Sequence, residues 1–221
     1  MFRRNREGAG LPLPEGGFRR YAAVLGTNLW KLIELNLLFL LFCLPVVTIP
    51  AALCGMNRVC MLLIRNGYCF LWDDFWQEFR RSFKRSLLPG LLFGLLTAAG
   101  YYCMSLGLSN SGLALWSTLF WALGMVCTAA GLCWGSYFFA LTSLLEQDVP
   151  GILKNAGLLC ILRPLRALGT LGIHLLAAFF LTVFYPLSLP LLLFFIPMLV
   201  QFSVCFLVNT LADSYILKTD E

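Results

Sequence analysis

The sequence predicts an all-α fold: a polytopic transmembrane helical bundle of about six membrane helices, with five as the alternative, plus cytoplasmic amphipathic helices. Hydrophobic residues make up 60% of the 221 residues and charged residues only 12%, whereas a soluble domain has roughly 25% charged residues. The apolar residues lie in blocks almost free of charge, at 35–56, 87–108, 113–145, 167–184 and 186–208. About 20 such residues span a bilayer as a helix. The blocks are apolar on all sides, unlike the alternating strands of a membrane barrel.

Basic residues predict how the chain crosses the membrane. The sixteen Lys and Arg residues fall before residue 32, at 54–86, at 146–166 and at Lys218. The connections at 108–112 and 185–190 carry none. By the positive-inside rule, the basic segments and both termini are cytoplasmic, and the two uncharged connections are external.

This topology predicts one transmembrane domain, at 28–213, between two cytoplasmic tails. The first tail, 1–27, is basic, rich in Gly and Pro and expected to be flexible, and the second covers 214–221. Membrane helices are expected at about 29–47, 51–66, 87–108, 113–145, 167–185 and 190–212. An amphipathic interfacial helix is expected at 72–85 and a linker helix at 151–166.

The first two membrane helices are separated by a proline-rich turn, in the stretch CLPVVTIPAA at 43–52. A single crossing here would place either the N-terminal arginines or the basic cluster at 80–85 outside, so we expect the chain to turn at 48–50 and return. Pro50 suits the first turn of a helix, because it lacks an N–H group. The returning segment is short and contains Asn57 and Arg58, so it either spans the bilayer or is re-entrant.

The segment 72–85 has an aromatic face at helical spacing and a basic C-terminal end. One interpretation is an anchor whose rings lie at headgroup depth and whose arginines contact anionic headgroups at the cytoplasmic face of the bilayer. The other is a docking helix for a protein partner. The candidate lipid or partner interface consists of Trp72, Phe75, Trp76, Phe79, Arg80, Arg81, Phe83, Lys84 and Arg85.

Two G-x-x-x-G motifs lie on the helices of the next hairpin. Gly90 and Gly94 form the first, and Gly131 and Gly135 form the second. Such motifs let helix backbones approach closely. We interpret them as helix packing within the chain rather than as a dimer motif.

Few polar residues lie within the apolar blocks, and these form a candidate intramembrane polar site. Glu34 follows Lys31 by three residues on one helical face, and Arg65 matches the depth of Glu34 better than Arg58 does. These residues form either a structural ion pair between the first two helices or a transport or sensing site. His174, the only histidine, is either a hydrogen-bonded packing residue or a proton relay.

Residues 27–94 resemble the YesL-like integral membrane proteins of bacteria. The resemblance rests on TNLWKLIELNLLFLLFCLPVVTIPAA, then LLIRNG, then FWQEFRRSFKRSLLPGLLFG. It implies a multi-pass protein of the bacterial plasma membrane, often encoded beside carbohydrate uptake or utilisation systems. Sugar-transport subunits or a sensor kinase are the partners that it implies. It transfers no catalytic or ligand residue.

The sequence contains none of the common motifs that would indicate an enzymatic reaction. The chain has no P-loop, no H-E-x-x-H and no G-x-S-x-G, and its nine cysteines contain no C-x-x-C pair. We therefore expect no catalytic residue, cofactor, metal or nucleic-acid partner. The expected function is that of a non-enzymatic accessory or regulatory membrane protein, and the alternative is a small self-contained transporter or channel.

Overall fold

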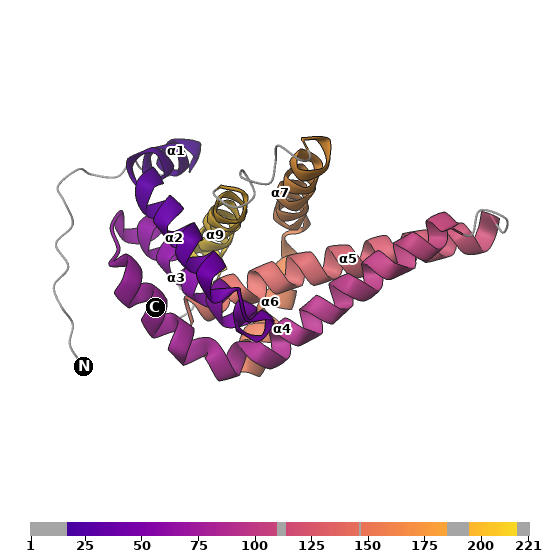
Figure 1. The fold of residues 1–221 in the computed structure, drawn as a ribbon, viewed down its shortest axis with the longest axis horizontal. Helices are drawn as coiled ribbons and strands as arrows, with labels where there is room; N and C mark the ends of the chain where they lie inside the picture. The colour runs from indigo at the N-terminus through magenta and orange to yellow at the C-terminus, as the bar shows by residue number, and fades with distance from the viewer. Residues whose placement is uncertain (1–16, 110–113, 146, 185–194, 216–221) are drawn as a thin grey trace.

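The computed structural model describes residues 17–109, 114–145, 147–184 and 195–215, and all regular elements in these ranges are helical. A compact group of helices surrounds α3, and a long hairpin extends away from it (Figure 1). The elements are α1 (Gly17–Thr27), α2 (Leu29–Phe42), the 3-10 helix η1 (Val46–Thr48), α3 (Ile49–Asn66), α4 (Leu71–Ser109), α5 (Ala114–Thr142), α6 (Val149–Leu162), α7 (Pro164–Val183) and α9 (Ile196–Tyr215).

The predicted all-helical, membrane-type fold is confirmed. Four described segments are long and apolar enough to cross a membrane: Val46–Asn66, Leu71–Leu108, Leu115–Thr142 and Pro164–Val183. A fifth is added if α1 and α2, bent by 74° at their junction, count as one broken span. The described residues thus support four or five spans rather than six. The predicted span at 190–212 begins outside them.

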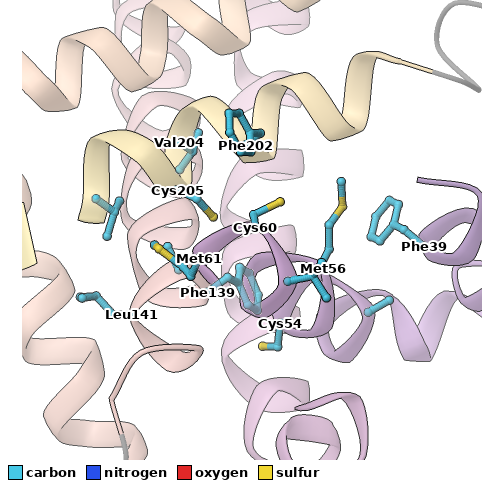
Figure 2. Packing of buried hydrophobic residues seen from close by; sticks show 14 of the residues in the cluster. Phe39, Cys54, Met56, Cys60, Met61, Phe139, Leu141, Phe202, Val204 and Cys205 are labelled. Carbon is cyan, nitrogen blue, oxygen red and sulfur yellow. The ribbon is translucent and has the colours of Figure 1, made fainter. Parts of the chain in front are cut away.

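Helix α3 lies at the centre of the compact group and is buried along most of its length. It contacts α1, α2, α4, α5 and α9. Figure 2 shows its side chains Cys54, Met56, Cys60 and Met61 among residues of the surrounding helices: Phe39 of α2, Phe139 and Leu141 of α5, and Phe202, Val204 and Cys205 of α9. The core is therefore built around the segment that the sequence predicted to be either a short membrane span or a re-entrant segment.

The last part of the predicted flexible tail, 17–27, is instead helix α1. Tyr21 packs against Phe202 and Phe206 with ring centroids 5.3 and 5.4 Å away, and its hydroxyl lies 2.9 Å from Ser203 Oγ. Arg20 donates from Nη2 to the carbonyl oxygens of Ile64, at 2.8 Å, and Arg65, at 3.1 Å. The last carbonyls of α3 lack partners within the helix and carry partial negative charge, so a guanidinium caps them favourably.

The predicted interfacial helix 72–85 and the span 87–108 are one continuous helix, α4, of 39 residues. Figure 1 shows that α4 changes direction along its length. Pro89 lies inside the helix, where it removes a backbone hydrogen bond and favours a kink. The predicted linker helix 151–166 corresponds to α6, which ends at Leu162. Pro164 then occupies the first turn of α7, a position that suits proline.

Close contact along the α4–α5 hairpin depends mainly on glycines outside the two predicted motifs. A Cβ atom on Gly124 would lie 2.6 Å from the Gly100 oxygen, and one on Gly107 would lie 2.8 Å from the Ser117 oxygen. Of the predicted glycines, Gly131 and Gly135 do pack against α4, where a Cβ atom would meet Thr97 and Phe93 respectively.

The first motif behaves differently from the prediction. A Cβ atom on Gly90 would meet Pro50 of α3 most closely and would lie 3.6 Å from Phe139 of α5, and one on Gly94 would meet nothing within 4 Å. Gly94 therefore does not mediate helix packing in this structure.

The exposed surface changes from charged to apolar along two helices. On α4 the exposed residues Arg80, Arg81 and Lys84 are followed by exposed Leu88 and Leu91. On α2, exposed Lys31 and Glu34 are followed by exposed Leu37 and Leu41. Charged side chains avoid the hydrocarbon region, so both helices pass from a polar to an apolar environment at these points.

The predicted turn between α2 and α3 is present and is built around Thr48. Its hydroxyl donates to the carbonyl oxygens of Phe42 and Pro45. Pro50, at the start of α3, lies against Gly90, and α4 continues from Gly90 to Ser109, about 28 Å further at 1.5 Å per residue. The turn thus lies beside the near end of the apolar part of α4. Because Val46–Asn66 is itself long and apolar enough to cross a membrane, a full crossing and a re-entrant segment both stay predictions.

Candidate functional site

The predicted polar site does not assemble around Glu34. Lys31 and Glu34 are both exposed on α2, whereas Arg65 donates from Nε to Asn209 Oδ1 of α9 at 2.6 Å. Arg58 donates from Nη1 to the Ser143 carbonyl oxygen, just beyond α5, at 2.8 Å. The predicted ion pair between Glu34 and an arginine of α3 is therefore wrong. The two arginines instead join the central helix to α9 and to the end of α5.

His174 lies on α7, and its Nδ1 is 2.8 Å from the carbonyl oxygen of Thr170 in the same helix. If Nδ1 carries the proton, Nε2 of the neutral ring is a hydrogen-bond acceptor. The side chain is half-buried and lines a cavity together with Gln201 of α9. His174 is thus a hydrogen-bonded residue that lines a cavity, and Glu34, Arg58 and Arg65 do not line this cavity.

The aromatic residues of α4 divide between the interior and the surface. Phe75 and Phe79 are buried and pack against Phe42 of α2, with ring centroids 5.5 and 4.9 Å away. The prediction that these two rings face lipid or a partner is therefore wrong. Phe83 is half-buried and packs against the core. Trp72 remains 56% exposed.

Trp72 and Trp76 form the exposed part of this aromatic set with Arg80. Their rings stack at a centroid distance of 6.2 Å and an interplanar angle of 16°. The guanidinium carbon of Arg80 lies 4.5 Å from the centroid of Trp76, a cation–π geometry. We call the set Trp72, Trp76, Arg80, Arg81 and Lys84 the α4 aromatic–basic face.

Arg85, the remaining basic residue of the predicted interface, contacts the connection between α5 and α6. Its Nη2 lies 3.7 Å from an Asp148 carboxylate oxygen and donates to the Gln147 carbonyl oxygen at 3.2 Å. Arg85 therefore fastens α4 to this connection and is excluded from the α4 aromatic–basic face.

Sequence analysis missed a buried polar strip on α4. Glu78 is only 4% exposed and accepts a 2.5 Å hydrogen bond from the Ser82 hydroxyl. Ser82 and Ser86 are also buried. The spacing of Glu78, Ser82 and Ser86 at i, i+4 and i+8 places them along one helical face, and this signal was available in the sequence.

Two large cavities adjoin α4, and sequence analysis found neither. The first, of about 690 Å³, lies between residues of α3, α4, α5, α7 and α9. Its lining is mostly apolar, and we call it the polar-walled cavity because it includes His174, Gln201 and Thr128. The apolar cavity, of about 660 Å³, lies between α4 and the η1–α3 segment. Ile49, Pro50, Gly90 and Gly94 line both. The described residues contain no group of three or more His, Cys, Asp or Glu side chains that could hold a metal ion.

Residues 32–102 match the family model described as "Protein of unknown function, DUF624". The matched segment covers most of α2, all of α3 and most of α4. It thus includes Glu34, Arg58, Arg65 and the α4 aromatic–basic face, whereas Lys31 lies just before it. No curated protein and no solved structure matches the chain.

Proposed function

We propose that this chain is a non-enzymatic accessory or regulatory protein of the bacterial plasma membrane that docks a protein of the carbohydrate uptake or utilisation machinery. The observation that carries the proposal is the α4 aromatic–basic face. Its residues are exposed or half-exposed and end at Lys84, immediately before the exposed surface of α4 becomes apolar. A partner at the membrane surface can therefore reach it.

The chemistry of this face favours a protein partner over a lipid surface. Trp72, Trp76 and Arg80 support one another through ring stacking and a cation–π contact, so little side-chain freedom remains to be lost on binding. Trp and Arg are the residues most enriched among interface hot spots. Exposed Arg81 and Lys84 add positive charge, so the complementary partner surface is acidic and contains a pocket for an indole ring.

The connection with carbohydrate uptake rests on the resemblance of residues 27–94 to the YesL-like proteins. The non-enzymatic part of the proposal is supported by the polar residues near α3. Arg58 and Arg65 donate to acceptors on neighbouring elements, and such bonds serve structure.

The test is co-purification of the full chain from native membranes in mild detergent. Wild type is compared with Trp72→Ala/Arg80→Ala, and sugar-transport subunits and sensor kinases are quantified by mass spectrometry. The matched control is Trp30→Ala/Lys31→Ala, which removes an exposed Trp and a basic residue from α2. We expect recovery of such a partner with wild type and the control, and at least about a tenfold loss with the α4 variant, since hot-spot truncations cost about 2 kcal/mol or more.

Undiminished recovery with the α4 variant would show that this face is not the docking surface. A second outcome separates docking from anchoring. If the α4 variant loses affinity for phosphatidylglycerol vesicles but keeps every partner, the face anchors the chain to anionic headgroups, and the docking proposal is wrong.

A small transporter or channel is the second candidate, and the polar-walled cavity is the observation that favours it. Its wall brings together His174, Gln201 and Thr128 from three helices. The candidate is weaker, because Glu34, Arg58 and Arg65 do not line this cavity. Uptake of a labelled sugar into proteoliposomes containing only this chain would favour it over the accessory function.

A further inference from the structure

Helix α6 has a buried face and an exposed face, and the exposed face is apolar toward its C-terminal end. The buried face consists of Ile152, Ala156 and Leu159. The opposite face carries large apolar side chains that are 50–79% exposed, namely Leu158, Ile161 and Leu162. The stretch 156–162 contains no charged, amide or hydroxyl side chain. Contact with water is therefore unfavourable for this end of α6.

Two contacts fix the middle of α6 against α5. Trp134 of α5 donates from Nε1 to the Leu153 carbonyl oxygen at 3.0 Å. A Cβ atom on Gly157 would lie 3.3 Å from the ring of the same tryptophan. The start of α7 reaches the same part of α5, because the Cys133 thiol donates to the Ala167 carbonyl oxygen at 3.3 Å. Helix α6 thus crosses α5 at Trp134.

The level of this crossing follows from the pairing of α5 with α4. A Cβ atom on Gly135, the next residue of α5, would lie 3.3 Å from Phe93 of α4. Phe93 lies about 7.5 Å beyond Leu88 along α4, at 1.5 Å per residue, and the exposed surface of α4 is already apolar at Leu88. The connection before α6, in contrast, contacts Arg85 through Asp148. Helix α6 therefore runs from the basic end of α4 to a level within its apolar part.

The basic residues of this segment lie on either side of the apolar stretch and limit its depth. Lys154 and Arg163 are both exposed. A long basic side chain can extend its charged end to the headgroups while its stem stays in an apolar region. Interfacial helices bury their apolar face by about 5–10 Å, which agrees with the level of Phe93. A helix at the centre of the bilayer would place these charges in hydrocarbon, which is costly.

The exposed apolar surface continues along the chain onto α7. Leu165 and Leu168 are 83% and 60% exposed, and the candidate span of α7 is only 6% buried within the protein. Acyl chains suit both surfaces, because neither offers a polar group to a partner along these positions. A protein bound to α6 would have to cover the start of α7 as well.

We propose that α6 is an interfacial helix in the leaflet beside the α4 aromatic–basic face, with Leu158, Ile161 and Leu162 in contact with the acyl chains of lipid. The sequence predicts only a linker helix for this segment, and the proposal gives it the membrane as its partner. The contact also anchors the connection before α6, which Arg85 contacts, at the membrane surface. It does not depend on the docking partner proposed above.

The test replaces Ile161 with the photoreactive residue p-benzoylphenylalanine in the full chain. Irradiation joins this residue to C–H bonds of the molecule that it touches, and mass spectrometry of the intact protein identifies the adduct. The chain is irradiated in vesicles of phosphatidylethanolamine and phosphatidylglycerol, and separately in native membranes. Leu95 of α4 is the lipid-facing control, because it is exposed at a comparable level. Exposed Lys84 is the control at the basic end of α4.

In the vesicles we expect a phospholipid adduct at position 161 with a yield within about twofold of that at position 95 and at least about fivefold above that at position 84, because the apolar face of an interfacial helix meets acyl chains. Native membranes should give the same lipid adduct. Position 158 replaces position 161 if that variant is not monodisperse.

Two results would overturn the proposal. A yield at position 161 as low as that at position 84 would show that the face lies in water. A protein adduct in native membranes, with a second copy of this chain or with another protein, would show that the face is a protein interface. Neither result bears on the α4 aromatic–basic face, so the docking proposal is tested separately.

Discussion

At the scale of single residues, the arginines act mainly as bridges between elements. Arg20 caps the end of α3, Arg58 bonds to the end of α5, Arg65 bonds to α9, and Arg85 holds the connection between α5 and α6. Their positive charge correctly predicts that these side chains lie among polar groups. Their partners, however, lie 44 to 144 residues away along the sequence, so no local pattern identifies them.

The Arg20 cap leads to a prediction on stability. Arg20→Ala should lower the free energy of unfolding by about 2 kcal/mol, because hydrogen bonds from a charged donor to the last carbonyls of α3 are lost. Thermal unfolding of the purified chain in detergent measures this. Arg19→Ala, which removes the exposed neighbouring arginine, is the control. Equal melting temperatures for the two variants would contradict a capping role for Arg20.

Arg65 and Asn209 should be coupled energetically. In a double-mutant cycle with Arg65→Gln and Asn209→Leu, we expect a coupling energy of about 1 kcal/mol, because each substitution breaks the same hydrogen bond. The parallel cycle with Arg65→Gln and Glu34→Gln should be additive, since Glu34 is exposed and forms no ion pair with Arg65. Denaturant unfolding measures both cycles, and coupling only in the second would restore the ion pair expected from the sequence.

At the scale of elements, α4 is one helix where the sequence predicted two, an interfacial helix and a membrane span. Its first part packs Phe75 and Phe79 against α2 and exposes the aromatic–basic face on the other side. Its second part pairs with α5 through Gly100, Gly107 and Gly124. Because α4 is continuous, a partner that binds the aromatic–basic face binds the same helix that lines both cavities.

Glycines on this helix pair should differ in their tolerance to substitution. Gly124→Ala places a methyl group 2.6 Å from the Gly100 oxygen, so the helices must separate, at a cost of about 1–3 kcal/mol. Gly94→Ala meets no neighbour within 4 Å and should leave stability unchanged or slightly higher, because alanine favours the helix. Thermal unfolding in detergent compares the two, and equal destabilisation would show that the close approach at Gly124 does not hold the hairpin together.

At the scale of the whole molecule, the surface divides into a charged part and an apolar part. The apolar part includes the α4–α5 hairpin and α7, where the candidate spans are only 17%, 11% and 6% buried within the protein. The candidate span that contains α3 is 61% buried. The exposed apolar surfaces of the hairpin and α7 are therefore suited to contact with lipid, whereas α3 is surrounded by other helices of the chain.

This division predicts the accessibility of the turn between α2 and α3. In a variant without the native cysteines, Val47→Cys should resist a membrane-impermeant maleimide from both sides, because the turn lies against the apolar part of α4. Lys84→Cys should react from one side only, which the positive-inside rule predicts to be the cytoplasm. Denatured samples of both variants provide the labelling control. Labelling of Val47→Cys from the outside would instead support a full crossing by α2 and α3.

The sequence alone determined the class of the protein and the main breaks in its helices. Long uncharged apolar blocks require a membrane-type helical fold, and Thr48 and Pro50 end one helix and begin the next through local chemistry. It did not determine which aromatic rings of α4 are buried, which acceptors the arginines reach, or where the cavities lie. These features depend on how helices that are distant in the chain pack around α3. This packing brings Phe42 to Phe79 and places Gly94 on the wall of the cavity that His174 and Gln201 also line. Local periodicity describes the faces of one helix, whereas tertiary packing decides what each face meets.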